Sequence, residues 1–148
     1  MELELSKEYT FESSHILPRH KGKCARLHGH SWKLKVYVAG VVDEETGFVM
    51  DYGDISEHVK PLIGKLDHYH FGATSYQHGP PTSPWLPKDI YPSSENLIVW
   101  IASQLTDLPW SKLELNETCT SSCTLTRKEY DDRTVGLGRS RSEALQQP

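Results

Sequence analysis

Two histidines separated by a single residue, His28 and His30, begin a segment in which apolar and polar side chains alternate. Successive side chains of a β-strand point to opposite faces, so both imidazoles lie on the face that Trp32 continues. That face is expected to be buried, and a titratable ring placed there needs a partner. The pattern favours a metal site over two ordinary core histidines, which are the alternative interpretation.

A third histidine, His15, stands in line with an alternating row that includes Tyr9 and Phe11. Taken alone, it is more typical of a core or surface histidine than of a ligand. Together with His28 and His30 it provides three imidazoles from two neighbouring strands. This is the ligand set of a catalytic zinc ion with one open position. Three imidazoles also accept cobalt, nickel or copper, so ligand type alone does not choose the metal.

Two further groups have the chemistry to move protons beside such a metal. Cys24 lies four positions before the first histidine of the pair, next to Lys23. Its thiol is a candidate ligand, a reactive thiolate favoured by nearby positive charge, or an inert buried residue. Asp67 and His68 are adjacent, so the carboxylate could orient the imidazole for proton transfer. The alternative is a histidine satisfied by the C-terminus of the preceding helix.

Glu117 shares a predicted strand face with Leu113 and Leu115, so its carboxylate projects where an apolar side chain is expected. A buried carboxylate needs a partner. That partner is either an internal Arg or Lys, or a ligand that presents a pair of N–H donors. The residues alone leave both open. His70 and His78 fall in a long loop and are expected to be solvated.

The composition restricts the class of protein. The chain has 148 residues, 36% hydrophobic and 24% charged, which predicts one globular domain with a modest core. A net charge of −4 argues against a broad nucleic-acid-binding surface. The longest strongly apolar run, 97–102, is too short to span a bilayer, and the N-terminus resembles no secretory signal. Three cysteines speak against a disulfide scaffold, so a cytoplasmic location is expected.

Hydrophobic periodicity predicts the strands that position these groups. Alternating patterns favour strands over 2–15 and 28–42. A turn and a short return strand over 48–52 are expected to form a hairpin with the second strand. Two more strands are predicted over 112–117 and 123–130.

Two helices are expected between the second strand and the last two. Asp51 or Asp54 caps the first, and Pro61 inside its pattern is expected to kink it or to move its start. Ser93 or Ser94 caps the second. Two helices with about four strands indicate the α+β class, and such a small sheet has edges that oligomerisation would close.

The order of several motifs along residues 9–123 resembles one family. They are YTFESSH, CARLHGHSW, GFVMDYGDI, LDH, PSSEN and NETCTSSC. Together they are similar to the 6-carboxy-5,6,7,8-tetrahydropterin synthase family, within the 6-pyruvoyl-tetrahydropterin synthase superfamily. The short gap between the cysteine and HGH, and the ETCTSSC segment, resemble the carboxy branch. The pyruvoyl branch tends to have a longer gap.

The resemblance implies a tunnelling T-fold. Its subunit has a four-stranded antiparallel sheet with two helices packed on one face. Oligomerisation closes the barrel, as two trimers stacked into a hexamer with active sites at subunit interfaces. In this chain the T-fold domain would occupy residues 1–130. The tail over 131–148 has little to bury and is expected to be disordered.

The resemblance also implies a role for each candidate residue. The reaction would be the zinc-dependent conversion of 7,8-dihydroneopterin triphosphate and water to 6-carboxy-5,6,7,8-tetrahydropterin, acetaldehyde and triphosphate, within queuosine or 7-deazaguanine synthesis. A pyruvoyl-forming synthase and a non-catalytic pterin-binding homologue are the alternatives. The implied roles are one zinc ion per subunit on His15, His28 and His30, catalysis by Cys24, Asp67 and His68, and pterin anchoring by Glu117.

Overall fold

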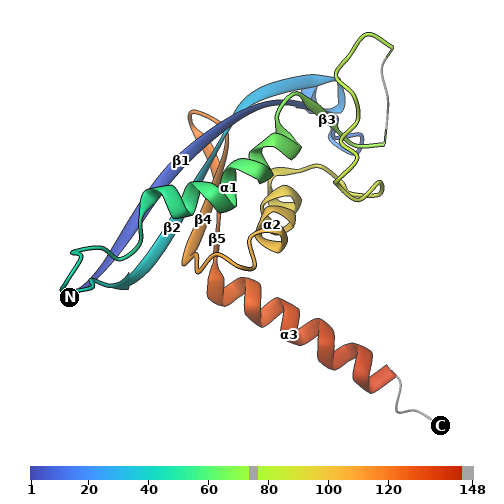
Figure 1. Cartoon of the computed structure of the whole chain (residues 1–148). Helices are drawn as coiled ribbons and strands as arrows, with labels where there is room; N and C mark the ends of the chain where they lie inside the picture. The colour runs from blue at the N-terminus through green and yellow to red at the C-terminus, as the bar shows by residue number, and fades with distance from the viewer. Residues whose placement is uncertain (74–76, 145–148) are drawn as a thin grey trace.

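The computed structural model describes residues 1–73 and 77–144 of the chain. The elements follow one another as a long strand pair, a helix, a short strand, a second helix, a second strand pair and a third helix (Figure 1). Their bounds are β1 Glu2–His15, the 3-10 turn η1 Lys23–Ala25, β2 His28–Val41, α1 Tyr52–Leu66, β3 Tyr69–Phe71, α2 Ser94–Gln104, β4 Lys112–Thr118, β5 Ser121–Thr126 and α3 Arg127–Ala144.

The five strands form one sheet in the order β3-β1-β2-β4-β5. β1 and β2 pair antiparallel along their whole length, so that His15 lies opposite His28. The prediction of four antiparallel strands is wrong in its count, because residues 69–71 form β3, parallel to β1. The predicted return strand over 48–52 is also wrong. Val49 and Met50 pack against the core instead, and Tyr52 already begins α1.

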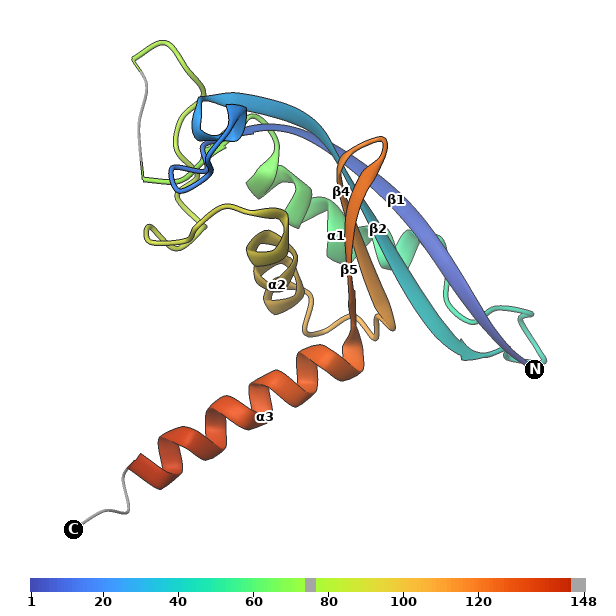
Figure 2. The ribbon, with the colours of Figure 1, turned by 180° about the vertical axis from the view of Figure 1, so that it is seen from behind.

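Helices α1 and α2 cover the same face of the sheet, as both views show (Figures 1 and 2). α1 begins after Asp51, whose carboxylate accepts a hydrogen bond from the Gly53 N–H at 2.5 Å. Pro61 lies inside this helix without displacing its start, since more than two turns precede it. α2 begins after Ser93, whose hydroxyl accepts from the Asn96 N–H. The α+β class predicted from the sequence is confirmed.

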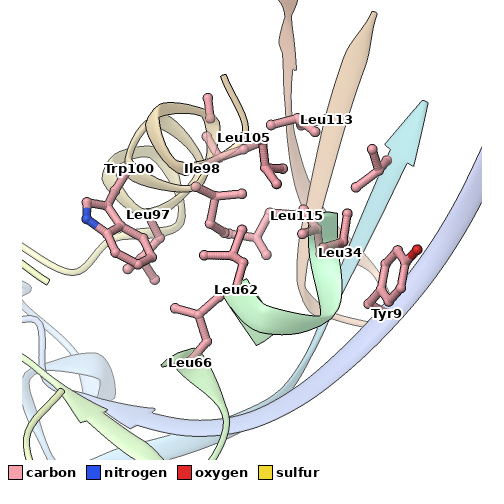
Figure 3. Packing of buried hydrophobic residues seen from close by; sticks show 14 of the residues in the cluster. Tyr9, Leu34, Leu62, Leu66, Leu97, Ile98, Trp100, Leu105, Leu113 and Leu115 are labelled. Carbon is pink, nitrogen blue, oxygen red and sulfur yellow. The ribbon is translucent and has the colours of Figure 1, made fainter. Parts of the chain in front are cut away.

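The hydrophobic core lies between these two helices and the sheet. Leucines of α1 and α2 meet those of β2 and β4 in the close view (Figure 3). Tyr9 of β1 lies at the margin of the core, and its hydroxyl forms a hydrogen bond with the hydroxyl of Ser56 in α1 at 2.9 Å. The fully buried side chains include Phe11, Trp32, Leu34, Ile55, Leu66, Phe71, Leu97, Ile101, Leu105, Leu108, Trp110 and Leu113.

A third helix continues through residues 131–144, where the sequence predicts a disordered tail. Thr126 and Glu129 form a reciprocal capping box at its start, with the Thr126 N–H donating to the carboxylate at 3.1 Å. Arg127 and Lys128 pair with Asp131 and Asp132 one turn later. These contacts are local. Tyr130 of this helix also packs against Trp110 of the core, with ring centroids 5.8 Å apart. None of the helices in the described part of the chain has the length and apolar content needed to cross a membrane.

Candidate metal and catalytic site

Three imidazoles and one carboxylate converge where β1 ends and β2 begins. One ligand atom each from His15, His28, His30 and Glu117 lies within 4.8 Å of the others. The Nε2 atoms of His15 and His30 are 3.1 Å apart. The strand register produces this arrangement, because His15 lies opposite His28 and Ser13 lies opposite His30. The structure therefore brings together the three histidines predicted as metal ligands.

Backbone carbonyls orient two of these rings. His15 Nδ1 lies 2.8 Å from the carbonyl of Pro92, and His28 Nδ1 lies 2.7 Å from the carbonyl of Arg26. A carbonyl only accepts hydrogen bonds, so each Nδ1 carries the proton and each Nε2 presents a lone pair. His28 Nε2 is buried and has no hydrogen-bond partner among the described residues. An orphaned, oriented imidazole nitrogen fits a metal ligand.

Burial favours the neutral form of His15 and His30. The pKa of His15 is lowered to about 4, against an ordinary value of 6.5, chiefly by burial, with the neighbouring imidazoles adding to the shift and the Pro92 carbonyl opposing it. The pKa of His30 is also lowered by burial, although Glu117 opposes the shift. Trp32 packs against two of the imidazoles. Its ring centroid lies 5.2 Å from that of His15 and 5.3 Å from that of His30. Neutral imidazoles at neutral pH leave their lone pairs available to a metal ion.

Glu117 lies beside the imidazoles. Its Oε1 atom is 3.2 Å from His15 Nε2 and 3.3 Å from His30 Nε2. The Nε2 atoms of these two rings, and no Lys or Arg nitrogen, contact its carboxylate among the described residues. Its side chain keeps 26% of its surface exposed, so the carboxylate also faces the outside of the site.

Cys24 lies in η1, within the loop that joins the end of β1 to the start of β2. The N–H of Leu17 donates to the carbonyl of Cys24 at 2.9 Å, and this hydrogen bond links the two sides of the loop. The thiol is free and half-buried. It is not one of the four residues whose ligand atoms converge, so nothing here makes it a fourth ligand.

Asp67 and His68 form a direct pair at the end of α1. His68 Nδ1 lies 2.9 Å from Asp67 Oδ2, and 77% of the His68 side chain is exposed. The pKa of Asp67 is lowered, chiefly by the hydrogen bond from the Glu12 N–H. His68 has a φ of 61°, and it is the one described residue other than glycine in this left-handed region. Such a conformation costs about 1–3 kcal/mol and is typical of functional positions.

The Asp67–His68 pair does not join the imidazole cluster within one chain. It contacts the outer edge of β1 at Glu12, which belongs to the strand face opposite His15. There His68 lines an open depression of about 410 Å³ together with Ser14, Ser31 and Pro80, and His30 borders the same depression. The predicted proton relay therefore lies outside the group of converging ligand atoms.

Sequence reasoning missed several contributors. His70, expected to be solvated, is buried, because the segment over 81–83 folds back and pairs with it. Its Nδ1 lies 2.9 Å from the hydroxyl of Ser14. The orienting carbonyls of Arg26 and Pro92 leave no mark in residue type. Only the proline-rich character of the loop hinted that it serves the site.

Comparisons with known proteins identify the family. The family model of 6-pyruvoyl tetrahydropterin synthase matches residues 4–128. A 6-carboxy-5,6,7,8-tetrahydropterin synthase from Synechocystis sp. is 38% identical over 124 residues, which cover 78% of this chain and 87% of the relative. A 6-pyruvoyl tetrahydrobiopterin synthase from Dictyostelium discoideum is 31% identical over 112 residues, covering 68% and 76% of the two chains.

Solved structures share the fold. The 6-pyruvoyl tetrahydropterin synthase of Plasmodium vivax superposes with a TM-score of 0.68 at 20% identity, covering 86% of this chain and 98% of that one. The corresponding Caenorhabditis elegans structure gives 0.67 at 20% identity, with coverages of 85% and 96%. The fold and the sequence matches agree. The chain belongs to the 6-pyruvoyl tetrahydropterin synthase family.

Proposed function

We propose that the protein is a carbon–carbon lyase that converts 7,8-dihydroneopterin triphosphate and water to 6-carboxy-5,6,7,8-tetrahydropterin, acetaldehyde and triphosphate. One observation carries the proposal. The ligand atoms of three imidazoles converge, while backbone carbonyls hold the Nδ1 atoms of His15 and His28. The similarity to a relative named for the carboxy product supports this choice of product.

Zinc is the proposed metal, held by His15, His28 and His30. Bound there, it would supply Lewis-acid polarisation of the hydroxyls on the substrate's side chain. The neutral rings present lone pairs, and the orphaned Nε2 of His28 gives the ion a ready ligand. The fully buried His15 excludes water from one side of the site.

Glu117 is proposed to anchor the pterin. Its carboxylate accepts two hydrogen bonds from the 2-amino group and the adjacent ring N–H, which match it in a bidentate fork. The partial exposure of this side chain supports the role, because the carboxylate is accessible beside the imidazoles. Cys24 is proposed to remove a proton from the substrate's side chain, and its position in the loop between two ligand-bearing strands supports this.

His68, oriented by Asp67, is proposed to return and relay protons. Because the pair lies outside the converging ligand atoms of its own chain, the relay would serve the cluster of another copy. The active site would then lie between subunits of an oligomer, proposed to be a hexamer of two trimers. The edge of the sheet at β5, where the described residues add no further strand, supports closure by other copies.

Product analysis tests the function. Zinc-loaded protein is incubated with 7,8-dihydroneopterin triphosphate beside a Cys24→Ala variant, and products are identified by mass spectrometry. Carboxy-tetrahydropterin and acetaldehyde, lost in the variant, support the lyase. A pyruvoyl product would instead support the second candidate, which the similarity to the Dictyostelium synthase favours. Bound pterin without turnover would overturn both.

A further inference from the structure

The main chain of Glu12 holds both residues of the Asp67–His68 pair. Its N–H donates to Asp67 Oδ1 at 2.8 Å, and its carbonyl accepts from the His68 N–H at 2.6 Å. The second oxygen of Asp67 is thereby left for the His68 ring, 2.9 Å away. These contacts hold the His68 backbone in its left-handed conformation against the edge of β1. One residue of β1 thus determines where the imidazole stands.

The side chain of Glu12 is also directed to the surface where His68 stands. The Ser31 hydroxyl of β2 donates to Glu12 Oε2 at 2.8 Å, across the strand pair. Glu12, Ser31 and His68 all line the open depression of about 410 Å³. Gly29 and His30 line it as well. Glu12 is the one carboxylate among the described residues that line it.

We infer that Glu12 is a further positioning residue for the proposed reaction, acting through His68: its carboxylate, held by Ser31, stabilises the imidazolium that forms when His68 takes up a proton. The inference rests on the proposed function. A histidine that relays protons passes through its charged form, and an acidic group facing the same depression favours that form. Asp67 contacts the ring directly, and Glu12 adds a second negative charge on the depression side.

Steady-state kinetics of Glu12→Gln test the inference. Glutamine keeps the size of the side chain and an oxygen that accepts from Ser31, but it removes the charge. We expect kcat to fall about tenfold with KM for the pterin substrate unchanged within about twofold, because only the proton-transfer step loses stabilisation. Glu12→Asp, which restores the charge, should recover most of kcat. Glu8→Gln is the matched control, since Glu8 lies on the same strand face but outside the depression.

A second measurement needs no turnover. Diethylpyrocarbonate acylates only neutral imidazole, so Glu12→Gln should raise the acylation rate of His68 above that of the wild type, read by peptide mass spectrometry. The exposed His58 of α1 serves as the internal reference. Unchanged acylation and unchanged kcat in Glu12→Gln would overturn the inference. A wild-type protein that turns nothing over would overturn the proposed function instead, while the acylation rates would still decide the electrostatic role of Glu12.

Discussion

At the scale of single residues, the candidate centre depends on which nitrogen of each histidine carries a proton. The carbonyls of Arg26 and Pro92 each accept from the Nδ1 of His28 and His15, and burial favours the neutral form of His15. A metal ion then meets oriented lone pairs instead of rotating or charged rings. The residue types predict metal binding, and these backbone contacts orient the imidazoles for it.

Loss of one ligand should abolish tight metal binding. We expect His28→Ala to lower zinc affinity by more than about 100-fold, since even loss of an outer-shell partner costs about 10–100-fold. Competition with a chromophoric chelator measures the affinity. His58→Ala is the control, because that ring is exposed on α1 and bonds only to the carbonyl of its own helix. Equal zinc affinity in the two variants would contradict the assignment.

The stability of the metal-free protein should fall with acid. The unfolded chain protonates His15 as the pH drops through 6.5, but the folded chain resists until about 4. The unfolded state therefore binds more protons in this window, and the free energy of unfolding, complete above 6.5, decreases as the pH falls toward 4. By about pH 5 the expected loss is about 2 kcal/mol.

Urea unfolding of chelator-treated protein at several pH values measures this loss. His15→Gln should flatten the dependence, because glutamine does not titrate, whereas His58→Gln should preserve it. An acid dependence that persists unchanged in His15→Gln would show that another group is responsible.

At the scale of elements, helix ends and strand ends meet at the site. β1 ends at His15, β2 begins at His28, and α2 begins two residues after Pro92, whose carbonyl orients His15. The start of α2 is therefore both a structural cap and a support of the metal centre. The loop over 77–92, drawn at the same end of the molecule as β3, carries the chain to this point (Figure 1).

The cap of α2 offers a test at this scale. The hydroxyl of Ser93 accepts from the Asn96 N–H, so Ser93→Ala should lower the free energy of unfolding by about 1 kcal/mol. Zinc affinity should decline as well, because the adjacent Pro92 carbonyl loses its fixed position. Chemical denaturation and chelator competition measure the two effects. Ser94→Ala is the control, and an equal or greater loss of stability in that variant would show that the cap is misassigned.

At the scale of the whole molecule, the described chain keeps the imidazole cluster and the Asp67–His68 pair apart. The pair contacts the main chain of Glu12 and lies outside the group of converging ligand atoms. Under the proposed reaction, a second copy would bring the two groups together. The edge of the sheet at β5 offers a contact through which copies would assemble, whereas the segment over 81–83 pairs with β3.

Complementation between two inactive variants tests this arrangement. Cys24→Ala and His68→Ala proteins are each expected to be inactive. When they are unfolded together and refolded as a mixture, about a quarter of the sites should combine an intact Cys24 with an intact His68 from another copy. Activity should therefore return to about a quarter of the wild-type value. Mixing without refolding is the control, and no recovery after refolding would place both residues in one chain's site.

The sequence by itself determined the α+β class, the two long strands, the two covering helices and the identity of the candidate ligands. Local periodicity carries this information, because residues two apart share a strand face and the spacing of His15, His28 and His30 places them in line. It also marked Asp67 and His68 as a pair, since they are adjacent in the chain. The capping box that Thr126 and Glu129 form is also a contact between residues close in the chain. It supports the start of a third helix, where a tail without structure was expected.

Only the tertiary structure decided which groups meet across the chain. Pro92 approaches His15 over 77 residues, and Glu12 meets Asp67 over 55, by way of backbone atoms that every residue possesses. The parallel strand β3 and the burial of His70 likewise depend on a loop folding back on the sheet. A main-chain carbonyl or N–H has no signature in residue type, so the sequence could name the imidazoles but not the atoms that orient them.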